Sequence, residues 1–148
     1  MKAKLLGLLL LTLVACHKRE HTTLVVAAEE RPVAIEVEIY DPTTNFVWEN
    51  VAVRIVEAEV DGAGIGYANI IPDHWFFSDQ NGLVYLDGFV FADAQIGFLI
   101  NGAGQAVLEF AEGARVVLEV DALGFTAVFV EVLLSWDQPQ VFVSVPFS

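Results

Sequence analysis

Hydrophobic and polar residues alternate along most of the chain after residue 32. In the segment 33–40, Val and Ile occupy every second position, and Glu36 and Glu38 stand between them. A period of two predicts a β-strand with one buried face. Related patterns mark further candidate strand segments at 46–60, 75–77, 83–86, 89–91, 95–100, 106–110, 115–120, 126–136 and 141–147.

Residues that favour tight turns separate these segments. The clearest are DPTTN at 41–45 and the pairs Asn81-Gly82 and Asn101-Gly102, because Asn and Gly tolerate the positive φ angles of hairpin turns. Turn signals at about 8–12-residue intervals predict an all-β domain over residues 33–148, a seven- to nine-stranded antiparallel β-sandwich. A closed barrel is the alternative architecture that this pattern leaves open.

Two of the predicted strands depart from simple alternation. In 46–60 the apolar face changes near Val56, which predicts a β-bulge or a bend. The segment 126–136 is apolar on both faces, which predicts a central strand. Its inward-facing series runs from Val128 through Leu134 to Trp136, so we expect Trp136 in the core.

The N-terminus follows a different pattern. Lys2 and Lys4 precede an almost purely apolar run, residues 5–14, which is shorter than the roughly 20 residues of a spanning helix. A basic start, a short apolar run and small residues at its end are typical of a secretory signal peptide. The end of this run, Leu13-Val14-Ala15-Cys16, resembles the lipobox of bacterial lipoproteins.

The lipobox resemblance implies a signal peptide at residues 1–15 and a lipid on Cys16, the first residue of the mature chain. Residues 16–32 then form the lipidated cysteine and a tether. Two or three acyl chains, palmitate among them, give lasting membrane attachment. His17 rather than Asp follows the cysteine, which by the enterobacterial sorting pattern implies the outer membrane if the cell is Gram-negative. The alternatives are an ordinary signal peptide with an incidental cysteine and a buried N-terminal helix.

Charge and cysteine content narrow the functional classes. The chain has 20 acidic and 7 basic side chains, a formal net charge of −13. A nucleic-acid-binding protein needs a basic face, and this composition cannot supply one; the same deficit argues against docking on anionic lipid head groups. Cys16 is the only cysteine, so its lipidation leaves no thiol for a disulfide, and the domain depends on its core for stability.

Several turn motifs resemble those of carboxypeptidase-regulatory-like domains, which belong with transthyretin-like and adhesin B-type repeats. The motifs are Ser78-Asp79-Gln80-Asn81-Gly82 and Ala122-Leu123-Gly124-Phe125, within a match over residues 33–147. The resemblance implies a prealbumin-like or immunoglobulin-like sandwich and a non-catalytic binding or spacer role. No lysine follows Lys18, so the isopeptide bond of the adhesin repeats cannot form. The chain also ends without the Tyr-Arg-Gly-Ser of the related hydrolases.

Candidate site residues come from three weak signals. Asp73-His74 has the chemistry of an acid–base pair, but His74 is the only histidine after residue 32, and zinc requires three or four ligands. Calcium ligands would come from loop carboxylates; the candidates are Asp73, Asp79 and Asp87, with Asp61 and Asp93 as further acids. Trp48 and Trp75 flank loops, which makes them candidates for an exposed aromatic platform that binds a sugar or a peptide.

These observations predict a non-enzymatic module. We expect a membrane-anchored, extracytoplasmic lipoprotein of the cell envelope whose sandwich acts as a binding or structural domain, without a cofactor apart from the lipid. The expected partners are the membrane and an envelope protein or polysaccharide. The alternative is a carbohydrate- or calcium-dependent adhesion domain, and the third candidate is an uncharacterised hydrolase.

Overall fold

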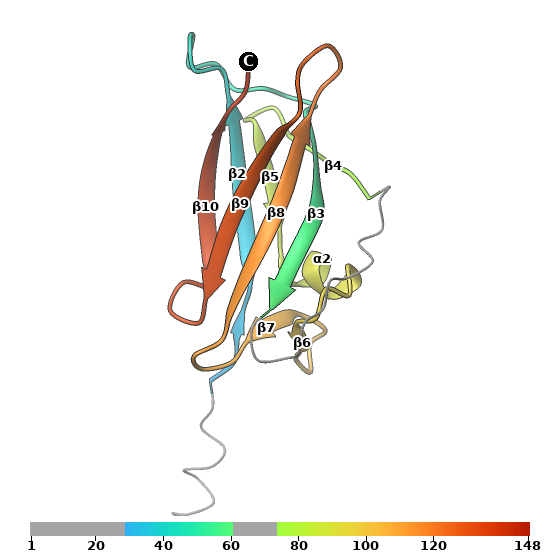
Figure 1. Ribbon diagram of the computed structural model, residues 1–148, viewed down its shortest axis with the longest axis vertical. Helices are drawn as coiled ribbons and strands as arrows, with labels where there is room; N and C mark the ends of the chain where they lie inside the picture. The colour runs from blue at the N-terminus through green and yellow to red at the C-terminus, as the bar shows by residue number, and fades with distance from the viewer. Residues whose placement is uncertain (1–28, 61–73) are drawn as a thin grey trace, which may run out of the picture.

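The structure is a computed structural model that describes residues 29–60 and 74–148 (Figure 1). Within them the chain forms ten strands in three sheets and one short helix, α2. The all-β prediction is confirmed, with more strands than the seven to nine expected because several are only two or three residues long. The elements are β1 Arg31–Pro32, β2 Ala34–Tyr40, β3 Ala52–Val60, β4 Phe76–Phe77, β5 Leu83–Leu86, α2 Gly88–Asp93, β6 Leu99–Ile100, β7 Ala106–Leu108, β8 Gly113–Asp121, β9 Val128–Ser135 and β10 Gln140–Pro146.

Two larger sheets form the body of the domain. One has the strand order β10-β2-β5 and the other β4-β3-β8-β9, and the two lie face to face (Figure 1). The third sheet, β1-β7-β6, lies with α2 at the end where the described chain begins. None of the described strands closes a sheet on itself.

The core lies between the two larger sheets. Val33, Ile35, Val37 and Ile39 are each 0% exposed, which confirms the buried face predicted for 33–40. They share one hydrophobic cluster with inward-facing residues of the opposite sheet, among them Val53, Ile55, Val116, Leu118 and Leu134. Complete burial of such a side chain contributes about 1.5–3 kcal/mol to the stability of the fold. The burial of these inward-facing side chains therefore holds the two sheets together.

The irregularity predicted near Val56 is confirmed. The pairing of β3 with β8 shifts register between Ile55 and Glu57, so Val56 is the extra residue. A bulge of this kind restores the inward direction of later side chains: Ala58 and Val60 are again buried beyond it.

The central position predicted for 126–136 is wrong, because β9 forms an edge of its sheet. Its inward residues Val132 and Leu134 are buried, whereas Phe129 and Leu133 on its outer face are 63% and 64% exposed. The apolar outer face is thus left uncovered in the described part of the structure. Trp136 is half-buried rather than in the core, since β9 ends at Ser135 and the chain turns away.

Among the strand pairs of residues 29–60 and 74–148, the antiparallel arrangement holds for all except one. β10 runs parallel to β2 over its whole length, from Gln140 opposite Ala34 to Pro146 opposite Tyr40. Residues 136–139 carry the chain from the edge of one sheet to the edge of the other, so its last strand lies beside its first long strand (Figure 1). Local turn signals cannot report this pairing, because the two strands are about a hundred residues apart.

The segment 89–91 is helical, not a strand. Asp87 is the N-cap of α2, and its carboxylate accepts hydrogen bonds from the backbone N–H groups of Phe89 and Val90. A side-chain oxygen at this position satisfies N–H groups that a helix start leaves free. Phe91 is fully buried. The cap and this burial override the strand preference of Phe and Val.

The predicted turns are present, although one of them does not form the hairpin that its sequence predicts. Asn101 Oδ1 accepts from the N–H groups of Ala103 and Gln105, inside a β6–β7 hairpin. Asn81-Gly82 instead lies between β4 and β5, which belong to different sheets. In the turn at 41–45, the Thr43 N–H holds the pKa of the Asp41 carboxyl below its ordinary value.

Candidate functional site

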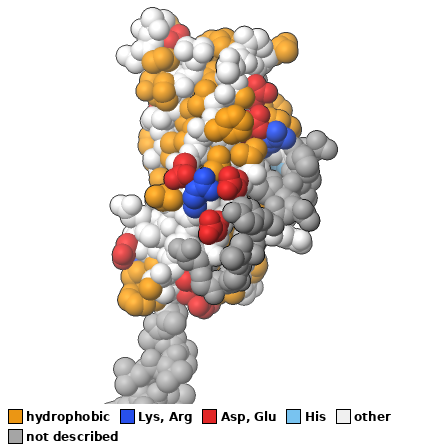
Figure 2. Space-filling model, viewed as in Figure 1, with side chains coloured by type: hydrophobic (Ala, Val, Ile, Leu, Met, Phe, Trp, Pro, Cys, Tyr) orange, Lys and Arg blue, Asp and Glu red, His pale blue; other side chains and the backbone are white. Residues whose placement is uncertain are grey.

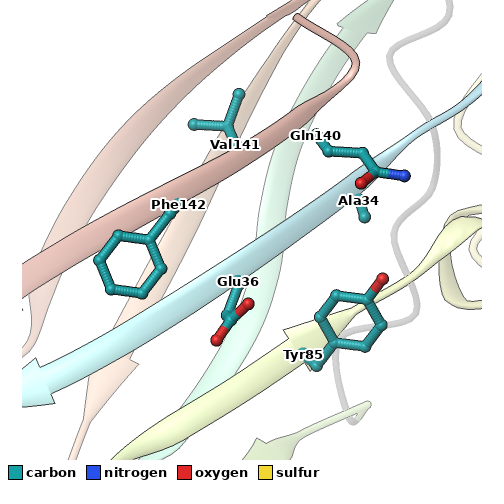
Figure 3. Close-up of a pocket in the computed structure, with 6 residues that line it drawn as sticks. All are labelled: Ala34, Glu36, Tyr85, Gln140, Val141 and Phe142. Atoms are coloured by element: carbon teal, nitrogen blue, oxygen red, sulfur yellow. The ribbon is translucent and has the colours of Figure 1, made fainter.

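A groove lies on the outer face of the β10-β2-β5 sheet, away from the core. We call it the outer groove. It has a volume of about 160 Å³, and the residues that line it are Ala34, Glu36, Tyr85, Gln140, Val141 and Phe142 (Figure 3). All three strands of the sheet contribute to it.

Strand register brings three of these side chains into one row across the sheet. Glu36 on the central strand lies opposite Phe142 in the parallel pairing and opposite Tyr85 in the antiparallel pairing. Tyr85 and Phe142 are 59% and 57% exposed, and Glu36 is half-buried between them. The row therefore presents one carboxylate between two aromatic rings.

The groove is hollow because of the residues next to this row. Ala34, two positions before Glu36 on the same face, has a side chain too small to fill the space, and Gln140 lies opposite it on β10. On the other side of the row, the Glu38 carboxylate accepts a hydrogen bond from the Ser144 hydroxyl at 3.1 Å. The Glu36 carboxylate has no such partner within the described ranges.

The outer face of the opposite sheet has a different character. There Arg115 donates to Glu131 at 2.7 Å and to Glu57 at 2.8 Å, which links three neighbouring strands. These hydrogen bonds, above all the one that Arg115 donates to Glu131, raise the pKa of Arg115 above its ordinary value. Arg54 and Glu119 form a second pair at 2.6 Å. Figure 2 shows basic groups next to acidic ones on this face, so its charges largely satisfy one another.

The two candidate tryptophans have separate intramolecular roles. Trp48 donates its indole N–H to the Phe147 carbonyl at 2.9 Å and packs edge-on against Phe125. Trp75 lies under the Arg54 guanidinium, 4.5 Å from its ring centroid. Both are half-buried, and the structure gives no ring contact between them. A shared aromatic platform of Trp48 and Trp75 remains a prediction, without a geometric feature that joins the two.

Two of the acidic candidates, Asp79 and Asp87, have backbone partners. Asp79 accepts from the N–H groups of Asn81 and Leu83, and Asp87 caps α2. In the described segments no cluster of three or more His, Cys, Asp or Glu side chains is arranged to hold a metal ion. His74 is exposed and stacks on Phe76 at 4.8 Å.

Other predicted features fall outside the described residues: Cys16, the signal peptide at 1–15, most of the tether, Asp61 and Asp73. The final tether residues do lie inside, and there Arg31–Pro32 pairs with β7 as β1. Among the described residues no helix has the length and apolar character needed to cross a membrane.

Sequence reasoning did not find the outer groove. Its central row joins positions 36, 85 and 142, which meet only through the pairing of three strands. One local signal was present: Tyr85 and Phe142 are aromatic residues at positions whose neighbours, Val84, Leu86 and Val143, belong to the inward-facing series. Large aromatic residues on the polar face of a strand indicate an exposed surface of interest.

Comparison with known proteins yields no relative. No family model matches the chain, no curated protein matches it, and no solved structure matches it. The resemblances to the lipobox and to carboxypeptidase-regulatory-like domains therefore remain predictions from short motifs.

Proposed function

We propose that this protein is a lipid-anchored module of the cell envelope that binds its ligand on the outer groove and performs no catalysis. The lipobox at residues 13–16 supports attachment to the membrane through Cys16. The observation that carries the binding role is the row of Phe142, Glu36 and Tyr85, in which exposed aromatic rings flank a carboxylate inside a groove. Pockets that combine aromatic walls with few polar groups are typical of ligand sites.

The proposed fold class is a prealbumin-like or immunoglobulin-like sandwich. The support is the face-to-face arrangement of two open sheets together with the positions of two turn motifs. Ser78 to Gly82 connects the two sheets, and Ala122 to Phe125 connects β8 to β9. Both motifs thus lie in loops, as they do in carboxypeptidase-regulatory-like domains.

A carbohydrate-binding adhesion domain is the second candidate. It is favoured by the same exposed rings, since aromatic faces that protrude from a sheet also stack on sugars. The calcium-dependent version has less support, because the Asp79 and Asp87 carboxylates already accept backbone hydrogen bonds.

The anchor is tested by Cys16→Ser. In cells fed a palmitate analogue, the unaltered chain should incorporate the label and fractionate with membranes. The Cys16→Ser variant should lose the label entirely and move to the soluble fraction, because the acyl chains on Cys16 supply the attachment of the unaltered chain. A matched variant, Thr22→Ser, should behave like the unaltered chain. Membrane association of Cys16→Ser that equals the unaltered chain would contradict the proposal.

A further inference from the structure

We propose that the outer groove recognises an organic cation, an ammonium or guanidinium group carried on an unbranched alkyl stem. This inference rests on the proposed function, because it names the ligand class of the same surface. It follows from the spacing, the charge and the size of the groove, taken in turn below.

The spacing of the row suits a group held between two rings. Adjacent strands lie about 4.8 Å apart, so Phe142 and Tyr85, on either side of the central strand, begin about 10 Å from each other. Glu36 lies between them at the same level, and all three side chains project from one face (Figure 3). A compact or planar group above Glu36 would contact both rings and the carboxylate together.

The charge of this surface favours a cation. Aromatic faces and carboxylates both attract positive charge. The strands β10, β2 and β5 contain no Lys, Arg or His, and their two charged side chains are Glu36 and Glu38. The three arginines of the described segments lie on other strands, β1, β3 and β8. An anionic ligand would meet repulsion here, whereas a cation would meet none from these strands.

The size of the groove suits a side-chain-sized ligand. A volume of about 160 Å³ corresponds to roughly five water molecules at about 30 Å³ each. This space accommodates a cationic head and a few methylene groups, whose stem would pack along Phe142 and above Ala34. Two sources carry this chemistry: free polyamines, and lysine or arginine side chains of a partner protein.

The test is an NMR titration of the isotope-labelled full-length chain in detergent micelles at low salt. The cationic probes are cadaverine, N-acetyl-lysine amide and N-acetyl-arginine amide; N-acetyl-norleucine amide and N-acetyl-citrulline amide are their neutral counterparts. We expect saturable shifts of the Glu36, Tyr85 and Phe142 amides with the cationic probes and none with the neutral ones. Tighter binding of cadaverine would indicate free amines, and tighter binding of the capped amino acids would indicate a partner's side chain.

Variants locate the binding. Glu36→Gln and Phe142→Ala should each weaken the affinity about threefold to tenfold, since each removes one attraction to the cation. Glu59→Gln and Phe129→Ala on the opposite sheet are the matched controls and should leave the affinity unchanged. Both altered groove side chains point away from the core, and circular dichroism with a urea unfolding curve checks that each variant is folded.

Three results would overturn the inference: no shift with any cationic probe, equal shifts with the lysine and norleucine amides, or full affinity in Glu36→Gln. Glucose is included as a further probe. Shifts of the same amides with glucose, and none with the cations, would keep the binding role and replace the ligand class. The membrane anchor is measured separately through Cys16, so a failure of the anchor and a failure of the ligand class can be told apart.

Discussion

A single methyl group at position 82 tests how tightly the turn before β5 is packed. Gly82 has a φ of +73°, and a Cβ there would lie 2.7 Å from both the Ile39 carbonyl oxygen and the Val47 Cβ. Positive φ costs an alanine about 1–2 kcal/mol, and the Ile39 backbone belongs to β2 and cannot move freely. We expect Gly82→Ala to lower the free energy of unfolding by about 1–3 kcal/mol, measured by urea denaturation.

Gly102→Ala is the matched control for this prediction. A Cβ at Gly102 has nothing within 4 Å, and its backbone lies outside the positive-φ region. Its effect should stay within about 0.5 kcal/mol, as for most surface substitutions. Equal losses in the two variants would show that glycine content, not the contact with Ile39 and Val47, sets the stability of these turns.

The turn at Asn81-Gly82 also shows how much of the fold the local sequence can predict. The Asn81-Gly82 signal correctly placed a turn, because the glycine at that position is required by its own φ angle. It did not predict that the strands on either side of the turn belong to different sheets, because sheet membership depends on pairings with β2 and β3, far away in the chain. For the same reason the residues of the outer groove could not be assembled from the sequence.

At the scale of elements, the sequence predicted secondary structure correctly where hydrophobic periodicity alone determines it. The prediction failed where a helix cap or a contact with a distant segment determines it. The alternation at 33–40 and the change of apolar face near Val56 in 46–60 are properties of the strands themselves, and both were predicted. The helix α2 depends on the Asp87 carboxylate and on close packing of Gly88 against Gln105 and Ala106. A six-residue helix whose sequence is GFVFAD is too short to show the hydrophobic periodicity by which a helix is recognised from sequence.

The importance of α2 to the core can be measured directly. Phe91 is fully buried and packs edge-on against Phe98 at 5.6 Å. Phe91→Ala should lower the free energy of unfolding by about 3–5 kcal/mol, since a buried ring is replaced by a cavity. Phe89→Ala, in the same helix but 48% exposed, should cost far less. Similar urea midpoints for both variants would contradict the placement of Phe91 in the core.

On the scale of the whole molecule, the two ends of the described chain are tied to the same body. β10 pairs with β2 along seven residues, and the Phe147 N–H donates to the Tyr40 carbonyl at 2.8 Å. The outer groove depends on this closure, because Phe142 and Gln140 reach Glu36 and Ala34 only through the parallel pairing. The binding surface and the fold are therefore specified by the same long-range contact.

The N-terminal end is held by a second long-range contact, which we call the Arg31–Trp136 clasp. The Arg31 guanidinium lies 3.7 Å above the Trp136 ring centroid and donates to the Trp136 carbonyl, while the Trp136 indole N–H donates to the Glu29 carbonyl. Stacked cations of this kind contribute about 0.5–2 kcal/mol. The clasp thus fixes residues 29–32 to the domain, at the end from which a tether to Cys16 would depart.

Arg31→Met removes the charge and the hydrogen bond of the clasp while keeping an unbranched side chain. We expect the free energy of unfolding to fall by about 1 kcal/mol and the Val33 N–H, which bonds to the Ala106 carbonyl, to exchange faster with solvent. Hydrogen exchange followed by NMR measures this site. Arg115→Met is the control, because it breaks ion pairs on the outer face of the β4-β3-β8-β9 sheet and should leave exchange at Val33 unchanged. Unchanged exchange in Arg31→Met would mean that β1 pairing with β7, rather than the clasp, holds the start of the domain in place.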